Sequence, residues 1–212
     1  MNTKDSIDRI FDHLDDWRNL PSYQLERRSD IFFAIYLEKI LAGKQLILSA
    51  EEFTVIPEFP VLTESEDYRT FKIDYAVFAH TASQSIVYFI ELKTDVRSVT
   101  QKQLDAYAKA KEKNVHELFE VVRTVSAASK QKAKYAHLIK KLDVLENQRN
   151  GDIKKIKPLV VYIVPDHSTK NIKIVDHWVT FDDIIKTLTE SVHNDLLTSR
   201  FVESLQNWKS PF

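Results

Sequence analysis

Two apolar runs, at residues 86–90 and 159–164, constrain the fold of this chain most strongly. Nearly every side chain in each run is apolar, so the strand that it forms has to be buried on both faces of a sheet. Other elements must then cover both faces, and helical periodicity occurs before, between and after the two runs. The pattern predicts an α/β domain with a mixed central sheet flanked by helices.

The spacing of apolar residues also predicts the order of the elements. The expected helices cover 4–18, 23–41, two or three segments between 99 and 148, 181–188 and 193–208. The expected strands cover 45–48, 53–59, 70–79, 85–93, 158–164 and 172–175. The polar hexapeptide HTASQS should join the third and fourth of these strands in a hairpin. Gly43 is expected to cap the second helix, and helix breaks are expected near Asn114 and Ser126–Ser129.

Composition excludes several classes of function. The absence of cysteine removes disulfides, cysteine nucleophiles, zinc fingers and iron–sulfur clusters. The two glycines are too few for a phosphate-binding loop of the P-loop or dinucleotide type. Carboxylate and histidine ligands remain, and these suit Mg²⁺ or Mn²⁺. The chain has no long apolar run and begins with an acidic, polar segment, so a cytoplasmic protein is expected.

Charge is unevenly placed along the chain, although the net charge is −1. Acidic residues outnumber basic ones over 51–100, and the reverse holds over 101–150. A basic helical segment beside an acidic strand pair is what a cation-dependent enzyme that acts on a polyanion would show. Solvated helix faces rich in lysine explain the same distribution, so both interpretations stay open.

Glu91 and Lys93 end the first apolar run and share one face of its strand, because they lie two positions apart. Burying an unpaired charge costs on the order of several kcal/mol. The pair is therefore either a structural salt bridge or a metal ligand beside a catalytic cation. Asp74 lies in the preceding strand, on the face opposite its apolar series, and the hairpin would bring it near Glu91. Two adjacent carboxylates repel unless a cation or a proton neutralises them, and an exposed aspartate is the alternative.

The next helical segment carries Gln103 and Tyr107, which share a face because they are four residues apart. An amide and a phenol at this spacing can donate hydrogen bonds to phosphate oxygens or steady a neighbouring lysine. Packing of the tyrosine on the sheet, with the glutamine at its rim, is the alternative. On the first interpretation, Tyr107→Phe should weaken the function of the site and leave stability nearly unchanged.

The helix expected over 23–41 adds an acidic candidate. Glu26 falls inside the apolar stripe of this helix, where a carboxylate needs a partner. Asp30 lies near the edge of the stripe, and Glu38 points away from it. Glu26 is therefore the better candidate, although an acid in the first turn also interacts favourably with the helix dipole.

In their order along the chain, these residues resemble the PD-(D/E)XK nuclease superfamily, which has the restriction-endonuclease-like fold. The order is an acid-bearing helix, Ile73–Asp74 on a strand, Glu91–Leu92–Lys93 after the next strand, and then a helix. The Gln103–Tyr107 pair resembles the Q-x-x-x-Y motif of the RecB and lambda-exonuclease branch. The resemblance covers residues 23–110, and the run 158–164 fits a further core strand of the family.

The chain departs from the family pattern in three respects. Ile73 stands where the family motif has proline, and the clustered cysteines of some RecB-like nucleases are absent. The helical stretch at 111–150 exceeds a minimal core and is expected to be an insertion. The resemblance thus implies a single domain, 1–212, with its core at 23–110 and 158–176.

The resemblance implies hydrolysis of phosphodiester bonds in nucleic acid, DNA in the first place, with Mg²⁺ or Mn²⁺ as cofactor. Asp74, Glu91 and the backbone carbonyl of Leu92 would hold the ion, which would polarise the phosphate and activate a water. Lys93 would orient that water or stabilise developing negative charge. Glu26 would act through the metal site or through the lysine, and the Q-x-x-x-Y pair would position the backbone.

The alternative function is a catalytically silent nuclease-like domain that binds nucleic acid or protein. Retention of two acids and a lysine favours the active interpretation, because a binding module has no need of all three. The sequence does not separate DNA from RNA, or endonuclease from exonuclease. It also leaves the oligomeric state open, a homodimer included.

Overall fold

The computed structural model describes residues 2–48, 50–62, 70–95, 98–166, 172–190 and 195–209, except the side chains of residues 62, 149 and 150. Within these residues a five-stranded sheet has the order β1-β2-β3-β4-β5. Its strands are β1 (Glu52–Leu62), β2 (Thr70–His80), β3 (Ser85–Leu92), β4 (Leu159–Val164) and β5 (His177–Thr180). The β1–β2 and β2–β3 pairs are antiparallel, whereas β3–β4 and β4–β5 are parallel. The predicted mixed sheet and the β2–β3 hairpin are confirmed.

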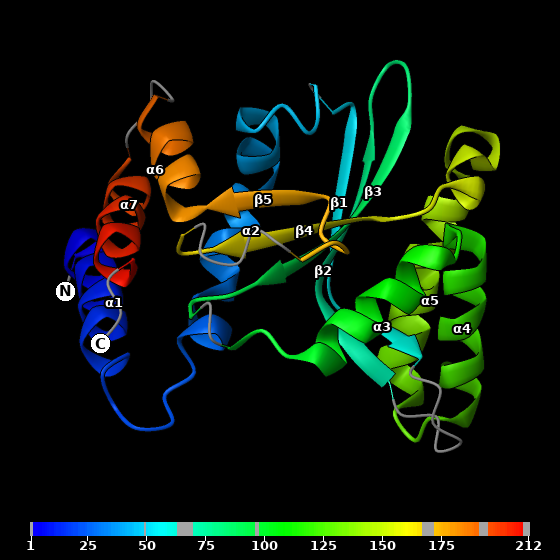
Figure 1. The fold of residues 1–212 in the computed structure, drawn as a ribbon, viewed down its shortest axis with the longest axis horizontal. Coiled ribbons are helices and arrows are strands. Elements are labelled where there is room, and N and C mark those ends of the chain that lie inside the picture. Colours follow the sequence, from blue (N-terminus) through cyan, green and yellow to red (C-terminus); the bar gives the residue numbers. More distant parts are fainter. Residues whose placement is uncertain are drawn as a thin grey trace.

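Helices cover both faces of the sheet (Figure 1). One layer combines the two ends of the chain: α1 (Thr3–Trp17), α2 (Leu25–Gly43), α6 (Phe181–Glu190) and α7 (Leu196–Trp208). The other layer contains α3 (Gln101–Glu112), α4 (Val115–Ala128), α5 (Lys132–Asn147) and a 3-10 helix (Gln148–Lys155). Each layer has its own hydrophobic cluster against the sheet, which is why the central strands are apolar on both faces.

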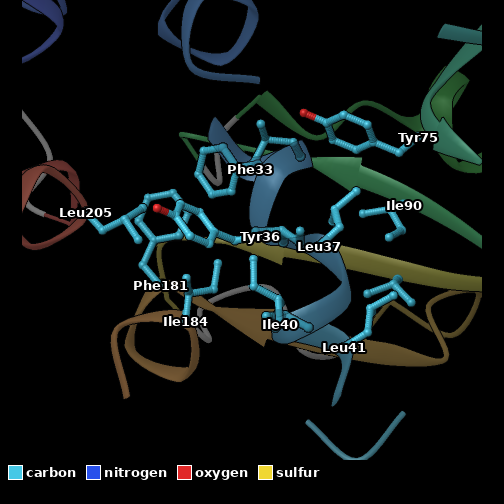
Figure 2. Close-up of a cluster of buried hydrophobic side chains, with 14 of the residues drawn as sticks. Phe33, Tyr36, Leu37, Ile40, Leu41, Tyr75, Ile90, Phe181, Ile184 and Leu205 are labelled. Carbon is cyan, nitrogen blue, oxygen red and sulfur yellow. The ribbon is translucent and has the colours of Figure 1, made fainter. Parts of the chain in front are cut away.

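α2 fills the centre of its layer, because its apolar stripe contacts the sheet and the two C-terminal helices (Figure 2). Phe33 packs at 5.7 Å from the ring of Phe181, and the hydroxyl of Tyr36 lies 2.8 Å from the Thr198 hydroxyl. Leu37 is fully buried beside them. These are the residues of the predicted apolar stripe, so the predicted helix register is correct.

Gly43 has a different role from the predicted one. It is the last residue of α2, and the C-cap is Lys44. A Cβ atom at Gly43 would lie 2.3 Å from Oγ1 of Thr187 on α6, far inside contact distance. The glycine is therefore needed for close packing of α2 against α6, and it does not cap the helix in a left-handed conformation.

The predicted breaks in the second half of the chain are confirmed. Asn114 caps α4, and its side chain accepts a hydrogen bond from the Glu117 backbone N–H at 3.0 Å. A second break, at Ser129–Gln131, separates α4 from α5. Phe119 of α4 and Leu142 of α5 are fully buried in the second hydrophobic cluster. The stretch predicted as an insertion thus supplies a large part of one core.

Some predicted elements differ from the structure in type or in bounds. Residues 45–48 form a turn and bends where a strand was predicted. The last strand is His177–Thr180, because this segment pairs with β4, whereas 172–175 contains a turn. The last helix begins at Leu196, and residues 193–194 of its predicted range lie outside the described residues.

The β1–β2 ladder is kinked in its middle. Pro57 pairs with Tyr75 and Phe59 pairs with Ile73, while Glu58 and Asp74 between them are unpaired. Glu58 has φ 52°, a left-handed conformation that is rare for a residue with a side chain. The odd-numbered side chains of both strands change clusters at the kink: residues 53, 55, 75 and 77 pack in the first hydrophobic cluster, and residues 59, 61, 71 and 73 pack in the second. At the position of Asp74, the kink therefore changes which face of the sheet the alternate side chains of both strands occupy.

Candidate active site

The candidate site lies where β2 and β3 separate. The ladder between these strands ends at the Tyr75–Ile90 pair. Beyond that pair, Oδ2 of Asp74 accepts a hydrogen bond from the backbone N–H of Leu92 at 2.8 Å. The Asp74 carboxylate thus joins the two strands at the point where their main chains part.

A cleft of about 320 Å³ opens at this point. Its lining comes from the first turns of α2, from β1 and β2 around and beyond the kink, and from the adjoining ends of β3 and α3. The lining residues are Glu26, Arg27, Asp30, Pro57, Glu58, Thr70, Phe71, Lys72, Asp74, Tyr75, Glu91, Leu92 and Gln103. Four of the six predicted catalytic side chains line this cleft, and Lys93 and Tyr107 contact it through Glu91.

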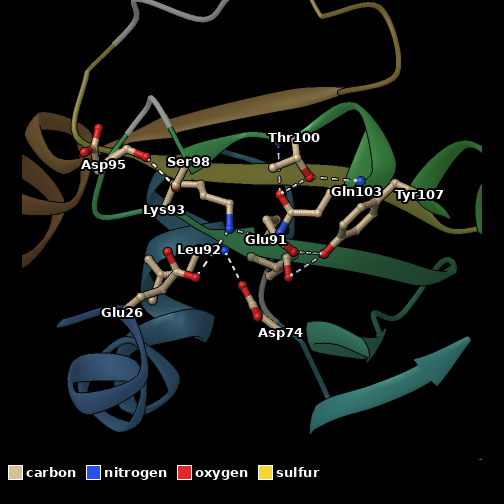
Figure 3. Close-up of polar contacts among 11 residues, drawn as sticks. Glu26, Asp74, Glu91, Leu92, Lys93, Asp95, Ser98, Thr100, Gln103 and Tyr107 are labelled. Atoms are coloured by element: carbon tan, nitrogen blue, oxygen red, sulfur yellow. Dashed lines mark hydrogen bonds and ion pairs between the residues drawn. The ribbon is translucent and has the colours of Figure 1, made fainter. Parts of the chain in front are cut away.

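Glu91 is the centre of the cluster, and only 1% of its surface is exposed. Oε1 accepts from Nε2 of Gln103 at 2.9 Å and lies 2.6 Å from the Lys93 ammonium (Figure 3). Oε2 accepts a hydrogen bond from the hydroxyl of Tyr107. A carboxylate can be buried this deeply because its charge is both paired and hydrogen-bonded.

Lys93 is 3% exposed and bridges two carboxylates. Its Nζ atom lies 2.6 Å from Glu91 and 3.3 Å from Oε1 of Glu26. Burial by itself would lower the pKa of Lys93, but Glu91 and Glu26 raise it above its ordinary value. Lys93 is therefore a permanent cation at neutral pH and is suited to stabilising negative charge, since it has no lone pair with which to accept a proton.

Glu26 reaches the cluster from the first turn of α2. Burial raises the pKa of its carboxyl, against the lowering effect of Lys93. Asp30, one turn further along, also lines the cleft, and its backbone carbonyl accepts from the Tyr75 hydroxyl at 2.7 Å. Glu38 is exposed to solvent. The structure thus brings Glu26 to the site and leaves Glu38 away from it, as the helix periodicity predicted.

Gln103 connects the site to the start of α3. Its Oε1 accepts from the backbone N–H of Thr100 at 3.2 Å, and the Thr100 hydroxyl accepts from the Gln103 backbone N–H. This reciprocal capping box orients the amide so that its Nε2 group points at Glu91. A T-x-x-Q sequence before a helix signals such a box, and residues 100–103 contain one. Sequence reasoning could therefore have found this second role.

Tyr107 lies one turn beyond Gln103 and is completely buried. Its ring is 5.7 Å from that of Phe71 and 5.8 Å from that of Tyr162. The ring packs against the sheet, as the second alternative predicted, while the hydroxyl donates to Glu91, which neither alternative predicted. Gln103 and Tyr107 both point toward the end of β3, and they hold the Glu91 carboxylate from two directions.

Asp74 has the most perturbed carboxyl of the site. Burial raises its pKa to about 8, nearby Glu91 adds to the rise, and the hydrogen bond from Leu92 opposes it. At neutral pH the carboxyl is thus mostly protonated in the protein alone. A partly buried carboxyl in a cleft with such a pKa is typical of a functional site, and a cation close by would favour its ionised form.

The donor set at Asp74 and Glu91 fits a hard divalent cation. The cluster contains three carboxyl groups, at Glu26, Asp74 and Glu91, against the single buried cation Lys93. Within the described residues, Oδ1 of Asp74 makes no hydrogen bond or ion pair, and Oε2 of Glu91 has one partner, Tyr107. Each carboxylate therefore keeps acceptor capacity for an ion. In the described part of the chain, no three His, Cys, Asp or Glu side chains gather as a ready-made metal site.

Sequence reasoning missed the two cations that line the cleft. Arg27 follows Glu26 on α2, and Lys72 lies on β2 beyond the kink, where it pairs with Glu58 at 2.6 Å. It also missed Tyr162, which is paired with Glu91 across β3 and β4 and is fully buried. The Tyr162 hydroxyl has no hydrogen-bond partner in the described residues. None of these positions has a local signal, because each depends on long-range strand placement.

Comparisons with protein-family models, with curated proteins and with solved structures found no match to this chain. Over the residues that the structure describes, no helix combines the length and apolarity that crossing a bilayer requires.

Proposed function

We propose that this chain is a divalent-metal-dependent nuclease with a restriction-endonuclease-like core, and that it hydrolyses phosphodiester bonds in DNA. The observation that carries the proposal is the buried cluster around Glu91. Two acids and a lysine from neighbouring strands meet at one cleft, and Gln103 and Tyr107 hold the central carboxylate. The resemblance to PD-(D/E)XK nucleases predicted this set of residues, and their shared cleft supports it.

Asp74 and Glu91 would hold the metal, with the backbone carbonyl of Leu92 as the third ligand. When bound, Mg²⁺ or Mn²⁺ supplies positive charge that polarises the scissile phosphate and activates water. Lys93 stabilises the negative charge that develops on the phosphate, since its ammonium is held beside Glu91 at 2.6 Å.

Glu26, Gln103 and Tyr107 act by positioning. Glu26 shares Lys93 with Glu91 and so fixes the ammonium from the α2 side. Gln103 and Tyr107 each donate to a different oxygen of Glu91, which fixes the plane of that carboxylate. A site held from three elements is rigid before substrate arrives, as electrostatic stabilisation requires.

A binding module without catalysis is the second candidate, and one observation favours it. Both oxygens of Glu91 already accept hydrogen bonds from protein groups, so the carboxylate is satisfied in the absence of a metal. In that case Asp74, Glu91 and Lys93 form a structural ion cluster and the cleft binds its partner without cutting it.

Cleavage of labelled DNA in Mg²⁺ or Mn²⁺ separates the two candidates. We expect cutting by the wild-type chain, loss of cutting with EDTA, and a rate loss of about 10²- to 10³-fold in Glu91→Gln and Lys93→Met. Lys209→Ala, which removes an ion pair with Asp182 on the surface, is the matched control and should cut normally. If the wild type cuts nothing in either metal, or if Glu91→Gln cuts normally, the nuclease proposal is wrong.

A further inference from the structure

The proposed reacting groups lie below the surface of the protein. Glu91 and Lys93 are 1% and 3% exposed, and access to them is through the cleft of about 320 Å³. A DNA duplex is stiff, with a persistence length of about 50 nm, and carries its phosphates on a convex exterior. A duplex would have to unpair locally before one of its bases could enter the cleft with the phosphate, at a cost of about a few kcal/mol. A single strand bends into such a space without that cost.

The lining of the cleft contains cations suited to a small number of phosphates. Arg27 comes from α2 and Lys72 from β2, so the two belong to different elements around the acidic cluster. Lys72 is 60% exposed and its partner Glu58 is 55% exposed. An ion pair this exposed is worth at most about 1 kcal/mol, so a phosphate can replace Glu58 at low cost.

The acids in the same cleft oppose a broad phosphate-binding surface. Glu26, Asp30 and Glu58 line it beside the two cations, and the net charge of the chain is −1. Duplex binding rests on many simultaneous phosphate contacts, each of which releases counterions. Two lining cations fit the few phosphates of a short single strand.

Phe71 adds an aromatic surface to the cleft. Its ring is partly buried and meets Tyr107 edge-on, with 5.7 Å between ring centroids and 73° between ring planes. Phe71 lines the cleft directly. Unpaired bases stack on aromatic side chains, whereas the bases of a duplex are stacked on each other and do not reach such a ring.

We propose that the cleft binds single-stranded DNA, with Arg27 and Lys72 contacting phosphates on either side of the one over Glu91 and with Phe71 stacking an unpaired base. This inference rests on the proposed nuclease function, since it names the substrate of the same site. Double-stranded DNA then enters only where its strands are already separated.

Binding of a fluorescein-labelled oligonucleotide, measured by anisotropy in EDTA, tests the inference without any need for cutting. The free strand should bind at least about tenfold more tightly than the same strand annealed to its complement. Phe71→Leu keeps an apolar side chain on Tyr107 but loses the ring, and should weaken single-strand binding by about 5- to 100-fold. Arg27→Ala should weaken it and lower the salt dependence by about one phosphate contact. Arg28→Ala is the matched control, because Arg28 is exposed and is not among the cleft-lining residues.

The outcomes separate this inference from the proposed function. Equal binding of single strand and duplex, or equal effects of Arg27→Ala and Arg28→Ala, overturns the single-strand inference. Cutting of duplex but not of single strand in Mn²⁺ also overturns it and leaves the nuclease function standing. Tight single-strand binding without cutting in either metal supports the inference and refutes the nuclease function. Tighter binding of an RNA strand of the same sequence overturns the assignment to DNA.

Discussion

Two charged clusters in this molecule contain similar residues but shift the pKa values of their carboxyls in opposite directions. Between α4 and α5, Arg123 contacts Glu120, Asp143 and Glu146 at 2.6–2.8 Å, and His116 contacts Glu146. At the cleft, Lys93 contacts Glu91 and Glu26. The first cluster joins two helices that follow each other in the chain, whereas the second joins α2 to the end of β3. In both clusters the carboxylates outnumber the cations, but most carboxylates of the first are exposed to solvent, whereas Glu91 is buried.

The pKa shifts make this difference explicit. Burial alone would raise the pKa of Glu146, but hydrogen bonds from Arg123 and His116 lower it below its ordinary value. Burial raises the pKa of Glu26 and raises that of Asp74 to about 8. The single positive charge of Lys93 lowers both pKa values but does not reverse either shift. Protein partners thus stabilise the carboxylate form of Glu146, whereas the carboxyls of Glu26 and Asp74 in the cleft keep raised pKa values.

Removing the central cation should break the cleft cluster far more than the other one. Lys93→Met leaves the buried Glu91 carboxylate and the partly buried Glu26 carboxylate without a cation, and should cost about 3–5 kcal/mol of unfolding free energy. Arg123→Met removes a more exposed charge and should cost about 1 kcal/mol or less. Urea titration of the two variants measures both values. Equal losses would show that the cleft cluster is an ordinary surface network.

Asp74→Asn should change how stability depends on pH. Between the ordinary value of 3.8 and about 8, the folded chain holds an Asp74 proton that the unfolded chain has released. The wild type therefore loses stability relative to Asp74→Asn as pH rises through this range, and the loss is complete above it. Glu146→Gln should give the opposite sign, because the lowered pKa of Glu146 stabilises the fold once pH exceeds the unfolded value. Thermal melts across the range would contradict this picture if the Asp74→Asn difference stayed constant.

Substitutions of the two buried tyrosines beside Glu91 extend the comparison to neutral side chains, with smaller expected changes in stability. Tyr107→Phe removes a hydrogen bond to a buried charge and should cost about 1.5–3 kcal/mol of stability as well as activity. The sequence alone predicted little change in stability, because burial of the hydroxyl was not visible in it. Tyr162→Phe removes an unpartnered hydroxyl from the same face and should leave stability unchanged or higher. Chemical denaturation of both variants compares them directly, and a larger loss in Tyr162→Phe would contradict the assigned roles.

Much of the site was predictable because its signals are local. The two-residue spacing of Glu91 and Lys93 on a buried strand placed both on one face, and helix periodicity separated Glu26 from Glu38. The order of these elements along the chain, with a hairpin between two of them, was sufficient to bring Asp74 to Glu91.

The rest depended on tertiary contacts that have no local signature. At the kink, Glu58 has a left-handed backbone conformation although it carries a side chain, and no local sequence pattern predicts this. Gly43 is explained only by its contact with Thr187 on another helix. β5 is a strand because β4 lies beside it, and pairing overrides the weak pattern of its four residues.

The proposed divalent-cation site at the cleft is tested most directly by the thermal stability of the chain with and without Mg²⁺. The measurement is made below and just above pH 8 in the wild type, Asp74→Asn and Glu146→Gln. Mg²⁺ should stabilise the wild type by about 2.7 kcal/mol at a hundredfold excess over its Kd. The effect should be larger above pH 8, where the cation no longer displaces the Asp74 proton. It should vanish in Asp74→Asn and persist in Glu146→Gln. No stabilisation in the wild type, or the same stabilisation in Asp74→Asn, would contradict a divalent-cation site at the cleft.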